Sequence, residues 1–294
     1  MGLTQARSAK TPPVTALDAL KHLVDSTDVM HAVSLVGIGL LAAWLVRTSL
    51  GRKSLAHSRP RRHSMSPLTP FVAFATWFVG GYALHSVVLA LSGPLDDEGE
   101  IWAGHIAVSV VAVLTLGLIL ALARFYFARG LKGFGLSPWT ILRDIRGAIV
   151  RLLAIWPLVL AAIVVTTRVA RVIEGQDFEM PQHEELEVMA EFPSAYLQAL
   201  IAFLAVVIAP LLEEMLFRGL LQSVIRSYVD RPWPAIVATS VLFAAVHSDS
   251  WHWPALFVLS LGLGYAYEKS GSLLQPIFMH ALFNGTVIVS ALTG

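Results

Sequence analysis

The residues best suited to chemistry lie around position 213, in a hydrophobic stretch where charged side chains are unexpected. Glu213 and Glu214 are adjacent, and Arg218 follows four residues after Glu214. Residues four apart share one face of a helix, so Glu214 and Arg218 are expected to form an ion pair. Glu213 points about 100° away from its neighbour. Because a charge at the bilayer centre costs at least about 2.5–3.5 kcal/mol, the pattern indicates one carboxylate neutralised by its partner and one left free to act as a base.

Two further polar groups occur in the apolar runs that follow. His247 ends a run that begins at Ala235, and both His280 and Asn284 lie in the last run. Their spacing of four puts His280 and Asn284 on one helix face, one turn apart. Each group on its own is compatible with a purely structural role. Polar side chains in membrane helices usually point into the bundle, so three such groups favour one shared site with a carboxylate, two imidazoles and a carboxamide.

Distances along the helices predict how deep these groups lie. Glu213 lies 18 residues before Arg231, and His247 lies 16 residues after it. At 1.5 Å per residue these separations are about 27 and 24 Å, so the two side chains are expected at similar depth. His280 follows the preceding loop closely and is expected nearer the cytoplasm. A cavity open to the cytoplasmic side would then join all three.

The elements that must position these residues are helices in lipid. The chain of 294 residues is 56% hydrophobic and 14% charged, with a mean hydropathy of +0.68. Soluble domains are closer to 45–50% apolar and about 25% charged. The absence of cysteine excludes disulfides, a thiol nucleophile and a thiolate metal site. A net charge of +1 gives no support to a nucleic-acid partner. The predicted fold class is an all-α, polytopic integral membrane helical bundle.

Runs of about 20 apolar residues are needed to cross a bilayer, because every backbone polar group must be satisfied within the segment. The sequence contains eight candidate runs, of which the sixth and seventh are short. The runs are Val29–Val46, Phe71–Leu91, Ile101–Ala123, Ile149–Thr166, Ala195–Leu212, Ala235–Val246, Pro254–Tyr267 and Leu273–Leu292. About eight transmembrane helices are therefore expected.

Charge alternates between the loops and predicts an orientation. Basic residues dominate at Arg47–Arg62, Arg124–Arg151 and Arg226–Arg231, whereas Asp96–Glu100 and Glu174–Glu191 are acidic. Basic loops are typically cytoplasmic, so the first, third and fifth loops are expected inside and both termini outside. The basic cluster of the first loop is interpreted as a topology signal, and a lipid-headgroup or regulatory site is the alternative.

The composition divides the chain into four parts. A polar tail (1–28) precedes accessory transmembrane helices with basic cytoplasmic loops (29–168), an acidic loop (169–194) and a core that carries the three polar groups (195–294). The acidic loop is interpreted as a solvated connector with a short surface helix. His252 lies between two tryptophans and is interpreted as a residue of the membrane interface.

The three polar groups resemble the motifs of a known family. Glu-Glu-x-x-x-Arg at 213–218, Phe-x-x-x-His at 243–247 and His-x-x-x-Asn at 280–284 are similar in order and approximate spacing to those of the CPBP family of intramembrane peptidases. That family includes type II CAAX prenyl endopeptidases, bacteriocin-processing and self-immunity proteins, and lysostaphin-resistance-like proteins. The resemblance covers roughly Ala195–Leu292 and implies hydrolysis of peptide bonds within the membrane.

The resemblance also implies roles for the site residues. Glu213 would be the general base that activates water, with His247 assisting, while the buried ion pair would hold this base in place. His280 and Asn284 would stabilise the oxyanion of the tetrahedral intermediate. Six residues are thus expected to be catalytic: Glu213, Glu214, Arg218, His247, His280 and Asn284.

Two questions stay open from the sequence. Glu213, His247 and His280 are the three residues that would ligate a catalytic Zn²⁺, with water in the fourth position. A metal-free glutamate mechanism uses the same residues and is favoured. The substrate is expected to be a membrane-associated or lipidated protein or peptide, processed in a CAAX-type or leader-peptide reaction. Membrane lipids are the other expected partners, and the bacterial plasma membrane is the expected location.

Two other functions fit the same residues. One is a non-catalytic membrane scaffold or immunity protein, in which the polar groups only hold the bundle together. The other is a proton-coupled transporter. A transporter predicts inverted repeats and interrupted helices in both halves, and the first half of this chain has no intramembrane acidic residue.

Overall fold

The computed structural model describes residues 27–293, so the predicted polar tail at 1–28 falls almost wholly outside the described residues. Within 27–293 the chain is helical and contains no β-strand, only one isolated bridge between His63 and Phe127. The predicted all-α class is therefore confirmed.

Each of the eight predicted apolar runs corresponds to a helix or, for Ala195–Leu212, to consecutive helical segments; Val246 and Leu273 are the only residues of these runs that fall outside. The principal helices are α2 (Thr27–Arg47), α3 (Thr69–Ser92), α4 (Asp97–Tyr126), α6 (Ile141–Glu174), α8 (Ala195–Phe203), α9 (Ala209–Glu214), α10 (Ser223–Tyr228), α11 (Pro232–Ala245), α12 (Trp253–Ser270) and α13 (Leu274–Thr293). Five helical stretches are long and apolar enough to span a membrane: 69–92, 97–126, 130–174, 195–228 and 274–292. Shorter apolar helices cover 31–47 and 232–245. The predicted membrane bundle is confirmed.

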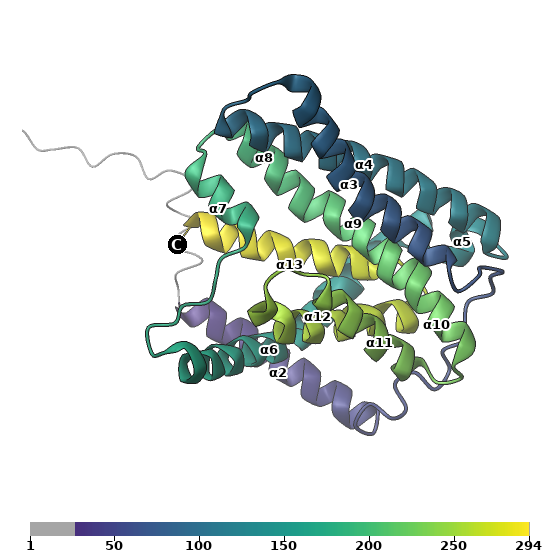
Figure 1. The fold of residues 1–294 in the computed structure, drawn as a ribbon. Helices are drawn as coiled ribbons and strands as arrows, with labels where there is room; N and C mark the ends of the chain where they lie inside the picture. Colours follow the sequence, from purple (N-terminus) through teal and green to yellow (C-terminus); the bar gives the residue numbers. More distant parts are fainter. Residues whose placement is uncertain (1–26, 294) are drawn as a thin grey trace, which may run out of the picture.

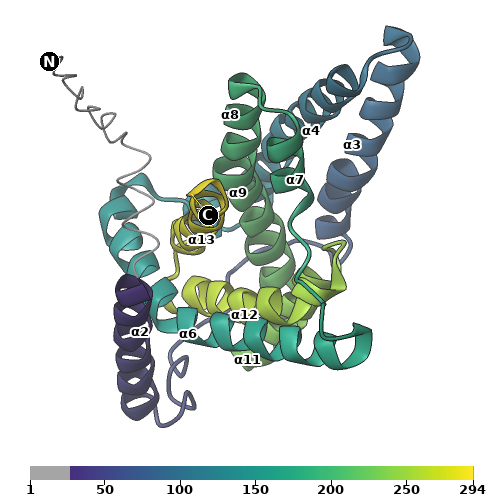
Figure 2. The ribbon, with the colours of Figure 1, turned by 90° about the vertical axis from the view of Figure 1, so that its left-hand side faces the viewer.

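The other helices surround one long helical stretch, Ala195–Tyr228, which is called the rod. Helices α8, α9 and α10 follow one another along the rod, and α13 packs against its middle (Figures 1 and 2). Helices α11 and α12 form an antiparallel pair, and α12 and α13 both pack on α6. Helices α3 and α4 pair on one side of the rod, while α2 packs on α6 on the other side (Figure 2).

The central rod is not a regular α-helix. Two π-helical segments, Leu204–Ile208 and Met215–Gln222, flank α9. Pro210 is the second residue of α9, and a proline has no N–H to donate to the carbonyl four residues earlier. Single π-helical turns often occur at functional sites, because they turn side chains and carbonyl groups out of the regular register. The two glutamates therefore lie on a short α-helical piece between two irregular ones.

The turn between α12 and α13 is covered by the third loop. The short helix α5 (Gly130–Phe134) ends at Gly135, whose φ of +106° favours glycine. The carbonyl of Gly135 accepts a 2.9 Å hydrogen bond from the N–H of Leu273, and the Tyr267 hydroxyl donates to the Phe134 carbonyl at 2.9 Å. A side chain at Gly219 would come within 2.2 Å of the Phe134 ring, so the rod needs a glycine there. The start of α13 is thereby held inside the protein.

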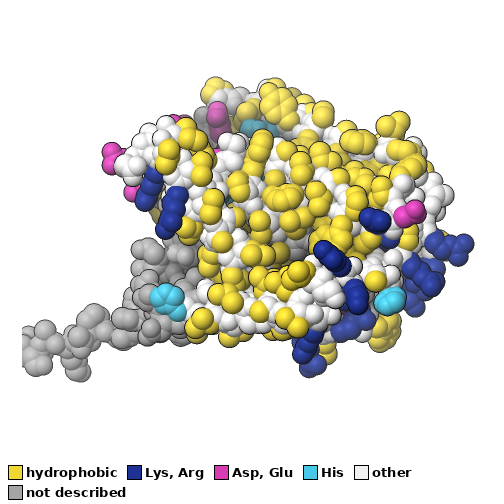
Figure 3. Space-filling model, turned by 90° about the horizontal axis from the view of Figure 1, so that it is seen from below, with side chains coloured by type: hydrophobic (Ala, Val, Ile, Leu, Met, Phe, Trp, Pro, Cys, Tyr) yellow, Lys and Arg dark blue, Asp and Glu magenta, His cyan; other side chains and the backbone are white. Residues whose placement is uncertain are grey.

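The two ends of the molecule differ in the charge of their side chains. Figure 3 shows Lys and Arg side chains gathering at one end, with hydrophobic side chains across the middle and acidic ones mostly towards the other end. The short helix α7 (Glu184–Glu191) lies in the acidic loop. This separation accords with the predicted orientation, in which the basic end faces the cytoplasm.

Candidate active site

The two adjacent glutamates lie in different surroundings. The Glu214 and Arg218 side chains are both fully buried, and Arg218 Nη1 donates to Glu214 Oε1 at 2.8 Å. The predicted ion pair is therefore present. The Glu213 side chain is 24% exposed, and its Oε2 atom is buried with no hydrogen-bond partner among the described residues. Glu214 is thus paired with Arg218, whereas Glu213 has no hydrogen-bond partner for Oε2 among the described residues and lies 4.0 Å from His280 Nε2.

Arg218 is held from two other helices. Its Nη2 donates to Ser260 Oγ at 2.6 Å and to the Ser260 carbonyl at 3.3 Å, and its guanidinium lies 4.5 Å from the centre of the Phe243 ring. Ser260 lies on α12 and is fully buried. Ser260 is not among the predicted site residues, because its only signal in the sequence is a hydroxyl in an apolar run. That signal is weak because serines in helices usually bond to their own backbone.

His280 joins the two glutamates. Its Nδ1 donates to Glu214 Oε1 at 2.9 Å, and its Nε2 lies 4.0 Å from Glu213 Oε2. Because Glu214 accepts the hydrogen bond from Nδ1–H, the ring is oriented with Nε2 towards Glu213. The expectation that His280 lies nearer the cytoplasm was wrong. The covered α12–α13 turn places the start of α13 deep in the protein, so His280 reaches the level of the glutamates.

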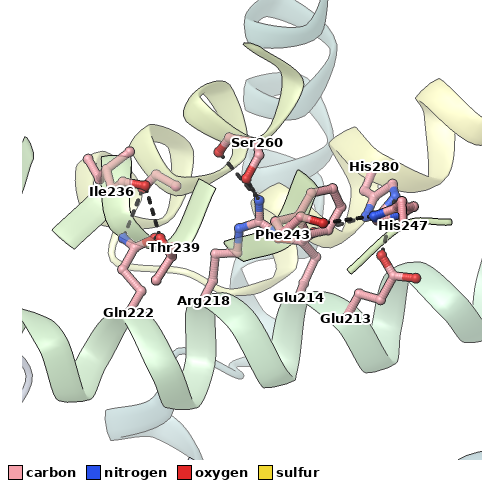
Figure 4. Close-up of polar contacts among 11 residues, drawn as sticks. Glu213, Glu214, Arg218, Gln222, Ile236, Thr239, Phe243, His247, Ser260 and His280 are labelled. Atoms are coloured by element: carbon pink, nitrogen blue, oxygen red, sulfur yellow. Dashed lines mark hydrogen bonds and ion pairs between the residues drawn. The ribbon is translucent and has the colours of Figure 1, made fainter. Parts of the chain in front are cut away.

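His247 is fixed in one tautomer. Its Nδ1 lies 2.7 Å from the Phe243 carbonyl oxygen, which can only accept, so Nδ1 carries the proton and Nε2 is left as an acceptor. The carbonyl of His247 in turn accepts a 2.9 Å hydrogen bond from Trp253 Nε1. Figure 4 shows His247 and His280 in the same part of the view as Glu213, and both imidazoles lie near the Phe243 ring, at 4.9 and 5.8 Å between ring centres. The grouping of His247 with the glutamates stays a prediction.

Asn284 lies one turn further along α13. Its Nδ2 donates to the carbonyl of Ala205 at 2.8 Å. Ala205 belongs to the first π-helical segment, where irregular hydrogen bonding makes carbonyl groups available to side chains. One N–H of the Asn284 amide is thus used to fasten α13 to the rod, and the amide has a second N–H to offer.

The residues do not fit a preformed zinc site. No group of three or more His, Asp or Glu side chains within the described part of the chain is arranged to hold a metal ion. The 4.0 Å between His280 Nε2 and Glu213 Oε2 also exceeds the roughly 3.4 Å expected for two ligands of one tetrahedral zinc. The reaction is therefore described with protein side chains and water alone.

The acidic loop packs over the segment that follows His247. The ring of Phe178 lies 5.3 Å from that of Trp251, and the imidazole of His183 stacks on that of His252 at 4.6 Å. Burial lowers the pKa of His183, and the nearby His252 acts in the same direction. His252 also lies 2.7 Å from a carboxylate oxygen of Asp249. The loop is thus more than a solvated connector, and His252 is partly covered by protein.

Comparison with known proteins gives a family for the part of the chain that carries this site. Residues 195–286 match the family described as type II CAAX prenyl endopeptidase Rce1-like. The match covers about a third of the chain and includes every residue of the three predicted motifs. The Rce1-like segment (195–286) runs from the start of α8 to just beyond Asn284, so it contains all six predicted site residues. The predicted resemblance is confirmed for this segment, and it identifies a membrane protease family.

One curated protein is similar to part of the chain. An uncharacterised 24.3 kDa protein of Escherichia coli is 40% identical over 78 residues, which amount to 25% of this chain and 36% of that protein. The similarity therefore spans about a third of the relative. No solved structure matches the chain significantly.

Proposed function

We propose that the chain is an intramembrane endopeptidase of the bacterial plasma membrane, which hydrolyses a peptide bond in a membrane-associated or lipidated substrate. The observation that supports this most directly is the state of Glu213. It is a partly exposed carboxylate in an apolar bundle, and its Oε2 has no hydrogen-bond partner among the described residues. Next to it is an imidazole whose orientation is fixed by a buried ion pair. Such a carboxylate is suited to act as a general base.

The proposed first step is attack by water. Glu213 accepts a proton from a water molecule, whose oxygen forms a bond to the carbonyl carbon of the substrate. The 4.0 Å between Glu213 Oε2 and His280 Nε2 is too long for a direct hydrogen bond but suits a water molecule that contacts both. The acceptor Nε2 of His247 is available to orient the same water molecule.

The proposed second step is the breakdown of the tetrahedral intermediate. The proton taken by Glu213 passes to the leaving amine as the C–N bond breaks, so the products are a carboxylic acid and an amine. The second N–H of Asn284 is proposed to donate to the oxyanion. His280 Nε2 is the other proposed donor, in the cationic form of the imidazole that carries a proton on both nitrogens before water is bound and keeps both through the reaction. Arg218 and Glu214 touch no substrate in this scheme; they position His280.

Two features favour an enzyme over a scaffold or a transporter. A purely structural polar network is expected to be shielded from water and substrate throughout, yet the Glu213 side chain is 24% exposed, whereas those of Glu214 and Arg218 are fully buried. A proton relay needs connected polar groups in both halves of the bundle. The hydroxyl hydrogen bonds of α3 and α4 stay within their own helices, and the buried Asp144 of α6 accepts from Ser272, outside the group of site residues. The Rce1-like segment adds the family's protease activity to this argument.

A groove beside the site supports an apolar or lipidated substrate. A cavity of about 1130 Å³ lies between α6 and α13 and is lined mainly by apolar side chains, including Trp156, Phe278 and Phe283. Ala281 and Gly285, which directly follow His280 and Asn284 in sequence, also line it. None of the six proposed site residues lines this groove, but α13 carries both His280 and Asn284, so an apolar chain bound there would lie against the helix that contributes to the site.

The proposal can be tested with the full-length protein in lipid nanodiscs. Three peptides are offered: a prenylated CAAX peptide, the same peptide without the lipid, and a hydrophobic leader peptide. Mass spectrometry should detect hydrolysis of at least one of them by the wild type and none by Glu213→Gln. Equal cleavage by both proteins, or no cleavage of any peptide by folded wild type, would favour the scaffold.

The same preparation tests the role of metal. We expect activity to survive chelators and elemental analysis to show no stoichiometric zinc. Zinc at one per chain, with activity lost to a chelator and restored by zinc, would replace the metal-free mechanism.

A further inference from the structure

A second cavity, remote from the glutamates, lies at the basic end of the molecule. It measures about 880 Å³ and is lined by two segments, 62–64 and 124–132. Four basic side chains line it, and no acidic one does: Arg62, Arg124, Arg129 and Lys132. All four are exposed. The cavity therefore concentrates positive charge without an internal counter-charge.

Hydrogen bonds hold the two segments next to each other. The N–H of Ser64 donates to the Tyr126 carbonyl at 3.0 Å, and the N–H of Ala128 donates to the Arg62 carbonyl at 3.0 Å. Between these bonds lies the isolated bridge, where His63 Nε2 also donates to the Ser223 carbonyl at 3.1 Å. The first loop and the end of α4 are thus tied together and to the rod, so the basic side chains project from backbone that is held in place.

The four basic side chains differ from their neighbours in having no protein partner. None of the four forms a hydrogen bond or an ion pair within the described part of the chain. By contrast, Arg61 donates to the Gly133 carbonyl at 3.1 Å and lies 3.9 Å from the centre of the Tyr267 ring, and Arg226 is buried beside Glu268. The positive-inside rule requires basic residues on this side but not their convergence on one cavity.

Apolar side chains border the same cavity. Phe125 is 81% exposed, and Tyr126 and Leu131 are also exposed. These residues lie at and just beyond the end of α4, which is long and apolar enough to span the membrane. Exposed aromatic residues beside cations are typical of the membrane–water interface. The cavity thus offers cations to a phosphate and apolar surface to acyl chains.

We propose that this cavity binds the phosphate of an anionic phospholipid headgroup. Basic pockets at the ends of transmembrane helices are suited to such headgroups, and arginine is suited to phosphate because of its planar fork of donors. A free phosphate ion shares the charge chemistry but makes no use of the apolar border. The lipid is therefore the expected ligand, and the site is separate from the peptidase site.

The test is native mass spectrometry of the full-length protein, titrated with phosphatidylglycerol and, separately, with phosphatidylcholine. We expect wild type to retain phosphatidylglycerol selectively. Arg124→Gln/Arg129→Gln should bind it about thirty-fold more weakly, because two headgroup contacts are lost. The matched control is Arg52→Gln/Lys53→Gln, which removes two exposed charges of the first loop that do not line the cavity. The control should bind like wild type.

Three results would overturn the proposal. One is equal binding by wild type and Arg124→Gln/Arg129→Gln. Another is an equal loss in both double variants, which would indicate attraction to the basic end as a whole. The third is complete displacement of the lipid by millimolar inorganic phosphate, which would make the free ion the ligand. Thermal unfolding in detergent without lipid verifies that both variants are folded, as their exposed positions predict.

Discussion

Helices α3 and α4 and the helices of the Rce1-like segment are similarly apolar, but only in the Rce1-like segment do polar side chains on the described residues also bond from one of these helices to another. In α3 and α4, Ser86 and Ser109 donate to carbonyl groups four residues earlier in their own helices. In the Rce1-like segment, Arg218 on the rod donates to Ser260 on α12. The first kind of bond satisfies a hydroxyl locally, whereas the second fixes the position of one helix relative to another.

The difference extends to the rest of the site. His280 on α13 donates to Glu214 on the rod, and Asn284 donates to the carbonyl of Ala205. Each of these bonds joins two helices. The buried Arg218, Glu214 and His280 form one connected group beside Glu213, the partly exposed carboxylate. A region that only packs in lipid has no need of such a network. The comparison therefore indicates that chemistry belongs to the second region and that α3 and α4 support it.

The largest effect is expected from breaking the buried ion pair. Arg218→Ala leaves Glu214 buried without its cation, and removing one partner of such a pair typically costs about 3–5 kcal/mol. Thermal unfolding in detergent should show a large loss of stability together with loss of activity. Adding Glu214→Gln should restore part of the stability. A double variant no more stable than Arg218→Ala would show that these two residues do not depend on each other.

The next largest effect, on kcat, is expected from removing either imidazole. His247→Ala and His280→Ala should each lower kcat about 10²–10⁴-fold, in the range of general acid–base catalysis. The double variant should be little worse than either single one, since the two rings act on one water molecule. Fully multiplicative losses, measured on the same peptide, would contradict a shared role.

A smaller loss is expected at Asn284. Asn284→Ala removes one of several proposed oxyanion donors, and such a loss costs about 10²–10³-fold in kcat. The KM should change little, and the melting temperature should fall modestly because the bond to Ala205 is lost. A fall in stability with kcat unchanged would assign Asn284 to structure alone.

The smallest effect is expected from removing single serine hydroxyl groups, one in the Rce1-like segment and one in α3. Ser260→Ala removes a hydroxyl bonded to a cation and should lower both stability and kcat, by about 1.5–3 kcal/mol in stability. Ser86→Ala is the matched control, because it removes a hydroxyl that bonds only within α3. The control should unfold within about 0.5 kcal/mol of wild type and keep full activity. Equal effects of the two variants would remove the contrast.

The fold was predictable because its signals are local. Lipid demands long apolar runs, and the eight runs in the sequence correspond to helices. The pairing of Glu214 with Arg218 was predictable for the same reason, since it depends on the spacing within one helix. The ends of α6 were not predictable, because the helix continues through polar residues on both sides of its apolar run.

The features of the site that the sequence did not predict depend on contacts between segments far apart in the chain. The depth of His280 follows from the covered α12–α13 turn, which is set by the bond from Leu273 to Gly135, and a helical rise cannot reveal such a bond. The role of Ser260 depends on which residue faces it across the bundle. The partner of Asn284 is a carbonyl in a π-helical segment, and no sequence spacing marks that segment clearly.

The central claim is that Glu213 is the base of a peptidase, and one measurement tests it most directly. Host cells lacking the chromosomal gene should produce wild type or Glu213→Gln at equal abundance in the membrane. Glutamine keeps the size and hydrogen bonding of the side chain but cannot accept a proton from water. Quantitative mass spectrometry of new protein N-termini should find membrane-derived cleavage products with wild type and none above background with the variant. The same set of new N-termini from both proteins would contradict the account and favour the scaffold.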